Sequence, residues 1–139
     1  MISAEQGTAP VASESDIVTV RKISREMATQ MGFGITDVTR IVTAVSELAR
    51  NIYRYAGTGI MQWQIINRNG IQGIELSFVD QGPGIPDLAL ALQPGYTSSD
   101  GLGMGLPGSK RLMDELEIES EIGTGTTVTI RKWLRGTSY

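Results

Sequence analysis

Two polar residues four positions apart, Glu47 and Asn51, form the first pair in this sequence that could do chemistry. They lie in a stretch whose apolar residues recur with helical spacing, and residues four apart share one face of a helix. A carboxylate can accept the proton of an attacking hydroxyl group. A carboxamide oxygen suits one position around a magnesium ion that keeps its waters and phosphate ligands. The alternative interpretation is the solvated polar face that every amphipathic helix has.

Asp80 is a second candidate, because it follows an alternating strand pattern. Ile74, Leu76 and Phe78 share one face of that strand, and position 80 is next on the same face. If the strand extends that far, the carboxylate points inward, where it needs a hydrogen-bond donor to offset its desolvation. In the alternative interpretation the strand ends earlier, and Asp80 starts a turn by accepting a hydrogen bond from its own backbone.

A glycine-rich stretch, DGLGMGLPGSKR, occupies residues 100–111. Read from Gly103, it matches the GxGxxG pattern of dinucleotide-binding turns, and kinase loops contain the same string. A dinucleotide-binding turn follows directly after a buried strand, whereas QPGYTSSD precedes this one. The match therefore does not indicate a dinucleotide site.

Three helices are expected to position these residues. Ser15 or Asp16 can cap a helix that ends near Met31, and Gly32 suits its C-terminal exit. A second helix is predicted from about residue 36 to 55, with an apolar stripe at three- and four-residue spacing. A short third helix fits residues 107–115, because proline is tolerated in a first helical turn.

The strands that follow alternate with a period of two and carry one solvated face, as antiparallel strands do. They are predicted around 61–65, 74–78, 116–122 and 126–130, and Asn69-Gly70 marks a turn. The helices must then cover the other face. We predict an α/β fold, a two-layer sandwich with a mixed, mostly antiparallel sheet, in which residues 1–15 form a flexible N-terminus and 16–139 one domain.

Composition excludes several classes of site. The 139 residues include neither cysteine nor histidine, so there is no disulfide, no thiolate nucleophile and no thiolate metal site. The net charge of −3 offers no basic field for nucleic acid. No run approaches the roughly 18 apolar residues of a membrane span. We expect a cytoplasmic protein with neither a nucleic-acid nor a membrane partner.

Four short motifs follow one another in a fixed order: ELARN at 47–51, DQGPG at 80–84, GLGMG at 101–105 and GTGTT at 123–127. In this order they resemble the ExxxN, DxGxG, GxGxG and GT boxes of the ATP-binding fold shared by DNA gyrase, Hsp90, histidine kinases and MutL. The resemblance covers about residues 16–134. Within that superfamily the sequence is similar to the serine/threonine kinases that act as switches in the stressosome, a bacterial stress-signalling complex.

This resemblance implies a role for each matching side chain. Glu47 would be the general base, and Asn51 would bind ATP as the Mg²⁺ ligand that bridges to the phosphates. Asp80 would accept a hydrogen bond from the adenine amino group, which supplies the donor that an inward carboxylate needs. Thr126 matches the threonine that supports adenine recognition.

The resemblance also assigns roles to the glycines. Gly82 and Gly84 would let the backbone approach the nucleotide. A lid over the triphosphate would end at the glycines of the third box, which are Gly101, Gly103 and Gly105. Some relatives place a phosphate-contacting arginine in this lid, and this sequence has none there. Lys110 and Arg111 are candidates to replace it, and in the alternative interpretation both are ordinary surface charges.

The implied activity is transfer of phosphate from Mg-ATP to a serine or threonine of another protein. The implied partners are STAS-domain scaffold or antagonist proteins as substrates and a PP2C-type phosphatase as the downstream target. A histidine kinase needs a phosphoaccepting histidine, which this chain lacks and a partner would have to carry. A gyrase, Hsp90 or MutL ATPase needs a second, transducing domain, for which we expect the remaining length to leave no room. The alternatives are a nonenzymatic, ATP-responsive interaction switch and an anti-sigma factor kinase.

Overall fold

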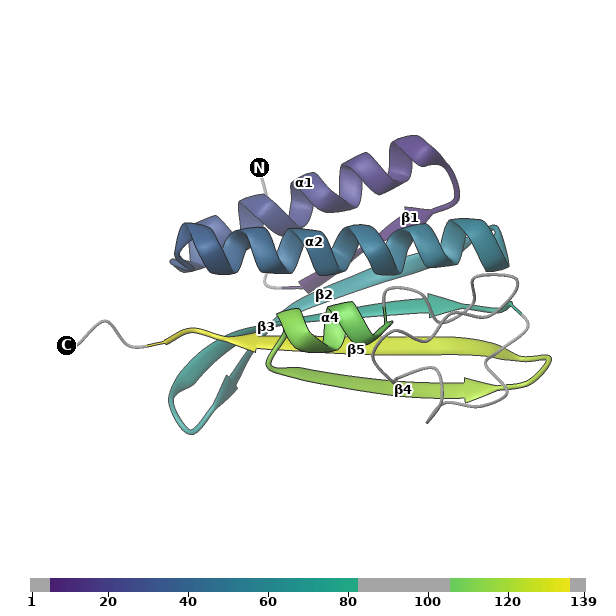
Figure 1. The fold of residues 1–139 in the computed structure, drawn as a ribbon. Coiled ribbons are helices and arrows are strands. Elements are labelled where there is room, and N and C mark those ends of the chain that lie inside the picture. Colours follow the sequence, from purple (N-terminus) through teal and green to yellow (C-terminus); the bar gives the residue numbers. More distant parts are fainter. Residues whose placement is uncertain (1–5, 83–105, 136–139) are drawn as a thin grey trace.

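The computed structural model describes residues 6–82 and 106–135. Within them the chain forms two layers, a five-stranded sheet and helices that cover one of its faces (Figure 1). The strand order is β1-β2-β3-β5-β4, and all four pairings are antiparallel. The predicted two-layer sandwich is confirmed. The strands are β1 (Gln6–Val11), β2 (Gly59–Arg68), β3 (Ile71–Asp80), β4 (Glu115–Glu121) and β5 (Gly125–Trp133). The helices are α1 (Glu14–Met31), α2 (Ile35–Asn51), the π-helical turn η1 (Ile52–Ala56) and α4 (Leu106–Leu112).

Strand β1 corrects the prediction that residues 1–15 are a flexible N-terminus. Residues 6–11 pair with β2 along one edge of the sheet, with Ala9 opposite Met61. Ala9 and Val11 face the core and are buried. The alternation typical of a strand is present in residues 6–11, but its inward-facing residues are small and pack closely against a neighbouring strand. A Cβ at Gly7 would lie 2.3 Å from the Trp63 ring, which explains one of these small residues.

Helix α1 begins two or three residues earlier than predicted. Ser13 is its N-cap, and its hydroxyl accepts a hydrogen bond from the Asp16 backbone N–H at 3.1 Å. The helix ends as predicted at Met31, where Gly32 adopts a left-handed conformation with φ 101°. Among the described helices none is long and apolar enough to cross a membrane.

Helix α2 provides the central apolar stripe between the layers. Every residue of the predicted stripe within α2 is buried: Val38, Ile41, Val42, Val45, Leu48 and Ala49. The α-helix stops at Asn51 rather than near Tyr55, and the chain continues as the π-helical turn η1 up to Gly57. Such turns are rare in proteins, and those that occur are often found at functional sites. Opposite α2, the inner face of β3 contributes Ile74, Leu76 and Phe78, each at most 1% exposed.

A buried lysine joins the helices to the far end of the sheet. Lys132 is 4% exposed, and its Nζ donates a hydrogen bond to the Leu112 carbonyl at 2.8 Å. Asp114 and Asp37 lie 3.7 and 3.8 Å from the same nitrogen. Helix α4 ends here, at Leu112 rather than at 115 as predicted, because the chain turns at Met113 to start β4.

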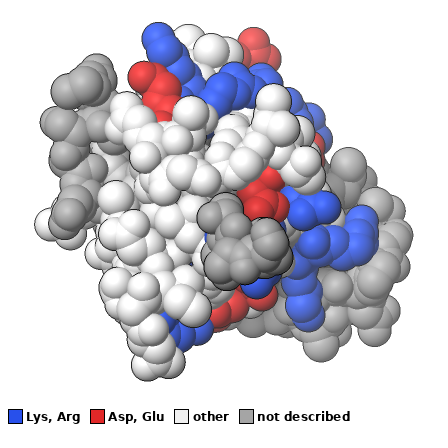
Figure 2. Space-filling model, turned by 90° about the vertical axis from the view of Figure 1, so that its left-hand side faces the viewer, with Lys and Arg blue, Asp and Glu red and all other residues white. Residues whose placement is uncertain are grey.

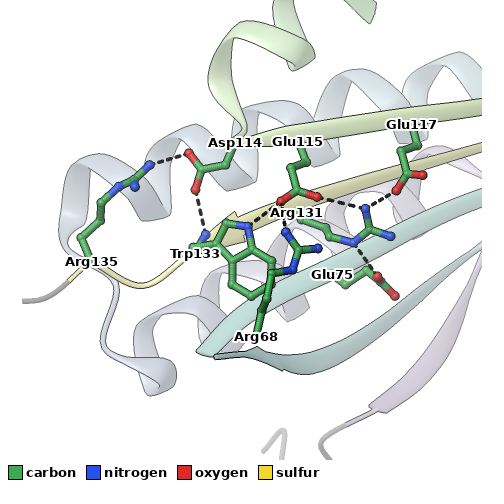
Figure 3. A network of polar contacts seen from close by, with 8 residues as sticks. All are labelled: Arg68, Glu75, Asp114, Glu115, Glu117, Arg131, Trp133 and Arg135. Atoms are coloured by element: carbon green, nitrogen blue, oxygen red, sulfur yellow. Dashed lines mark hydrogen bonds and ion pairs between the residues drawn. The ribbon is translucent and has the colours of Figure 1, made fainter. Parts of the chain in front are cut away.

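The outer face of the sheet is polar, as the alternation predicted, and its charges are paired (Figure 3). Arg131 binds Glu75 through Nε at 2.7 Å and also binds Glu115 and Glu117. Arg68 lies 4.5 Å above the Trp133 ring and binds Glu115 at 2.7 Å. The hydrogen bonds from Arg68 and Trp133 hold the pKa of Glu115 below its ordinary value, and the bond to Glu117 raises the pKa of Arg131.

Candidate functional site

Asp80 lies at the last position of β3, on the inner face that also carries Phe78. The alternative in which the strand ends before Asp80 is therefore wrong, because the strand pairing continues to Gly59 on one side and Thr126 on the other. The carboxylate is half-buried, and its Oδ1 accepts the Gly82 backbone N–H at 2.8 Å. The local turn that the sequence suggested is thus also present, and it leaves the carboxylate with further capacity to accept hydrogen bonds.

Thr126 lies beside Asp80, as its register partner on β5. It is 9% exposed, and its hydroxyl shares a 2.9 Å hydrogen bond with the Ser120 hydroxyl. An open pocket of about 470 Å³ is lined by this end of the sheet, including Asp80, Gln81, Ser120 and Thr126. Carboxylates and hydroxyl groups from β3, β4 and β5 therefore line one hollow, with Asp80, Ser120 and Thr126 among them.

Gly125 is a residue of this region to which sequence analysis gave no role beyond its place in the GTGTT motif. Its φ is 137°, and a Cβ there would lie 2.2 Å from the carbonyl oxygen of Asp80. Glycine is thus required for β5 to begin against the end of β3. The signal was available, because this glycine directly precedes the threonine assigned to adenine recognition.

Gly82 brings the second motif against the end of the helix layer. A Cβ at position 82 would lie 2.8 Å from the Cβ of Ala56, the last residue of η1. The sequence-based role of Gly82, close approach of the backbone to a nucleotide, stays a prediction. The described contact gives this glycine a packing reason of its own.

Glu47 and Asn51 share the polar side of α2, and Asn51 is the last residue of that helix. Glu47 is 41% exposed at its side chain and forms an ion pair with Arg50 at 3.3 Å. Asn51 is half-buried. The residue after it, Ile52, packs against Gly59, where a Cβ would lie 2.8 Å from the Ile52 side chain.

Because Gly59 is the register partner of Asp80, this contact joins the end of α2 to the end of β3. The structure therefore places the predicted residues Asn51, Asp80, Gly82 and Thr126 at one end of the two layers, with Glu47 one helical turn away. This end lies on the right in Figure 1.

Four predicted site residues lie outside the described residues: Gly84, Gly101, Gly103 and Gly105. Their roles stay predictions. Helix α4 begins directly after them, at Leu106. Lys110 and Arg111 on α4 are exposed, and a phosphate contact of either one also stays a prediction.

Comparison with known proteins places this arrangement in a family. Residues 11–132 match the family described as the histidine kinase-like ATPase domain. The chain is 47% identical over 131 residues to the serine/threonine-protein kinase RsbT of Bacillus subtilis, covering 94% of this chain and 98% of that protein. It is 37% identical over 103 residues to an anti-sigma F factor of Geobacillus stearothermophilus, covering 69% of each chain.

Solved structures agree on the fold. The RsbU and RsbW domains of a Mycobacterium tuberculosis protein match 96% of this chain and 34% of that one, with a TM-score of 0.68 at 20% identity. The mycobacterial sensor histidine kinase MprB matches with a TM-score of 0.56 at 19% identity, covering 95% of this chain and 99% of that one. The ordered motifs, the two-layer fold and these matches agree, so this chain belongs to the histidine kinase-like ATPase family and, within it, to the serine/threonine-protein kinases of the RsbT type.

Proposed function

We propose that this protein transfers phosphate from Mg-ATP to a serine or threonine of STAS-domain scaffold or antagonist proteins in a bacterial stress-signalling complex, the stressosome. After release from that complex it binds and activates a PP2C-type phosphatase. We place this activity in the cytoplasm, in keeping with the absence of cysteine from the sequence. The 47% identity to RsbT over nearly the whole length of both chains supports the assignment.

The observation that carries the proposal is the inward-facing carboxylate of Asp80 next to Thr126. A half-buried carboxylate at a hollow favours a ligand that brings a hydrogen-bond donor, because a buried acceptor left unpaired is costly. The exocyclic amino group of adenine is such a donor. Asp80 uses one oxygen for Gly82 N–H and retains capacity for this second bond.

The chemistry of the metal fits the residues around Asn51. Among the described residues no group of three or more acidic, histidine or cysteine side chains could hold a metal ion. A single carboxamide oxygen suits Mg²⁺, which takes one or two protein ligands and completes its shell with waters and substrate phosphates. In this proposal Asn51 would hold the ion, and the bound ion would neutralise charge on the phosphates. Glu47 is exposed enough to meet a hydroxyl group of another protein and accepts its proton.

Phosphate transfer tests this proposal directly. The wild-type protein is incubated with radiolabelled ATP, magnesium and candidate STAS-domain proteins, and label is expected on a serine or threonine of one of them. Glu47→Gln should lower the initial rate by at least about 100-fold, because removal of a general base typically costs that much. A matched control is Glu26→Gln, a carboxylate on α1 that does not line the hollow at Asp80 and forms no ion pair with a described residue, so this variant should retain the wild-type rate. Equal rates for the two variants would contradict the role of Glu47.

Nucleotide binding tests the adenine site separately. Asp80→Asn replaces one of the two acceptor oxygens by an NH2 donor and removes the charge, so ATP affinity measured by calorimetry should fall by about tenfold or more. An unchanged affinity would remove Asp80 from the adenine site.

The anti-sigma F relatives favour one competing function, direct binding of a sigma factor. The same assay separates the two, because a binding module would capture its partner without transferring label. Stable association with a sigma factor and no labelled protein would replace the kinase proposal. The phosphatase role is tested by adding the protein to a PP2C-type phosphatase and measuring its activity, which should rise.

A further inference from the structure

A groove of about 340 Å³ lies where α1 passes the end of α2 and the turn η1. Apolar and basic side chains from all three elements form it. Its lining consists of Glu14, Ile17, Val18, Arg21, Arg50, Tyr53 and Arg54. None of these residues belongs to the adenine hollow at Asp80 and Thr126.

The charge of this groove is opposite to that of the protein. Three guanidinium groups line it against the single carboxylate of Glu14, whereas the chain as a whole has a net charge of −3. Arg50 is paired with Glu47, but Arg21 and Arg54 form no ion pair with the residues that the structure describes. The Nε of Arg21 is buried and finds no hydrogen-bond acceptor in the same part of the chain. An incoming carboxylate would satisfy groups that the fold leaves unpaired.

The groove also has an apolar side. Five large hydrophobic residues are exposed among the described residues, and two of them, Val18 and Tyr53, line this groove at 61% and 39% exposure. Interfaces are enriched in tyrosine and arginine, which combine contact area with hydrogen bonding. The lining therefore fits a segment that carries both acidic and apolar side chains.

The groove adjoins the candidate base. Arg50 lines the groove and binds the Glu47 carboxylate at 3.3 Å. A segment held by Arg50 therefore lies next to Glu47. We propose that this groove docks an acidic segment of the protein substrate, an inference that rests on the proposed kinase function.

The test is a charge reversal that leaves Glu47, Asn51 and Asp80 in place. The double variant Arg21→Glu, Arg54→Glu is compared with Lys22→Glu, which changes an exposed neighbour on α1 outside the groove. The probe is the STAS-domain protein that takes label in the transfer assay or, if none does, each candidate STAS-domain protein in turn. Binding is measured at low and high salt, and ATP affinity is measured for every variant.

The double variant should raise the dissociation constant for the STAS-domain protein by about tenfold or more, since like charges placed in an interface repel. Its KM for that protein should rise with kcat and ATP affinity unchanged, while Lys22→Glu should match the wild type. Substituting lysine for acidic residues in the partner should restore binding to the double variant.

Two outcomes would overturn the docking proposal. Unchanged binding would show that the arginines do not meet the substrate, and a loss of ATP affinity would assign them to the nucleotide. The kinase proposal fails differently. If the wild type binds a STAS-domain protein without labelling it, and the double variant abolishes that binding, docking stands and phosphate transfer falls.

Discussion

Arginine is used in two different ways in this molecule. On the outer face of the sheet, Arg131 meets three carboxylates and Arg68 meets one carboxylate and the ring of Trp133 (Figure 3). In the groove between α1 and α2, Arg21 and Arg54 meet no carboxylate of the described residues. The first set holds strands together, whereas in the docking proposal the second set meets the substrate. Lack of an ion pair is not enough to mark the groove, because Arg25 and Arg111 also form none with a described residue; the groove combines its unpaired arginines with exposed apolar side chains.

At the end of the molecule opposite the candidate site, charged side chains are also paired with one another, as they are on the outer face of the sheet. Acidic and basic side chains lie next to one another in several places there (Figure 2). Arg40 pairs with Asp37 at 3.2 Å, and Arg135 pairs with Asp114 at 2.7 Å. Charges that neutralise one another on the surface offer little to a charged partner. The two regions should therefore differ in how substitutions of their arginines affect stability and binding.

The largest effect on stability is expected for Arg131→Met. This change removes the guanidinium and leaves Glu75, Glu115 and Glu117 side by side without their shared partner. Because Arg131 is 18% exposed at its side chain, the free energy of unfolding should fall by about 2 to 3 kcal/mol. Denaturant unfolding measures this, with Arg40→Met as the exposed control, for which a loss under about 0.5 kcal/mol is expected. Similar losses for both would contradict the structural role of the outer cluster.

A smaller effect is expected for Trp133→Phe. The variant keeps a ring beneath Arg68 but loses the hydrogen bond that Nε1 donates to Glu115 at 2.8 Å. A loss of about 1 kcal/mol should follow. Trp63→Phe is the matched control, since the Trp63 Nε1 is buried and has no acceptor in the described part of the chain. Both variants shrink the ring, and only the first removes a hydrogen bond, so equal losses would rule out the bond as the cause.

The pH dependence of stability gives the third test. The folded-state pKa of Glu115 is lowered by Arg68 and Trp133, so the ionised form is favoured in the folded protein. Its contribution is therefore present above the ordinary value of 4.5 and is lost as the pH falls through the lowered pKa. The stability gap between wild type and Glu115→Gln should be largest near neutral pH, under about 1 kcal/mol for this half-exposed network, and should close in acid. A stability gap that widens in acid would contradict the lowered folded-state pKa of Glu115.

Local periodicity made much of this fold predictable. The stripe of α2 and the alternation of β3 specified which faces are buried, and position 80 followed from the second pattern. Strand β1 was missed because its inward residues, such as Gly7 and Ala9, are too small to stand out in composition. Lys132 was missed because its acceptors come from α2 and from the end of α4, far away in sequence.

The functional surfaces likewise include residues that local sequence motifs indicated and residues that only tertiary packing brings together. The resemblance of the four ordered motifs to a known ATP-binding fold made Glu47, Asn51, Asp80 and Thr126 candidates, but no spacing rule joins Arg21 to Arg54. These two arginines line the same groove only because α1 packs across the end of α2. Surfaces formed by tertiary packing of distant segments leave no local signal, and for this reason the groove emerged only from the structure.

The smallest effect on stability is expected for substitutions of the two unpaired arginines of the groove. Arg21→Gln and Arg54→Gln should each change the free energy of unfolding by no more than about 0.5 kcal/mol, because neither removes an ion pair with a described residue. Glutamine keeps most of the aliphatic stem that covers the groove while it removes the charge. Denaturant unfolding of both variants and of Arg131→Met therefore compares the loss in free energy of unfolding for unpaired and for paired arginines. If either groove variant lost as much stability as Arg131→Met, that arginine would be a structural residue, and its contrast with the paired arginines of the outer face would fail.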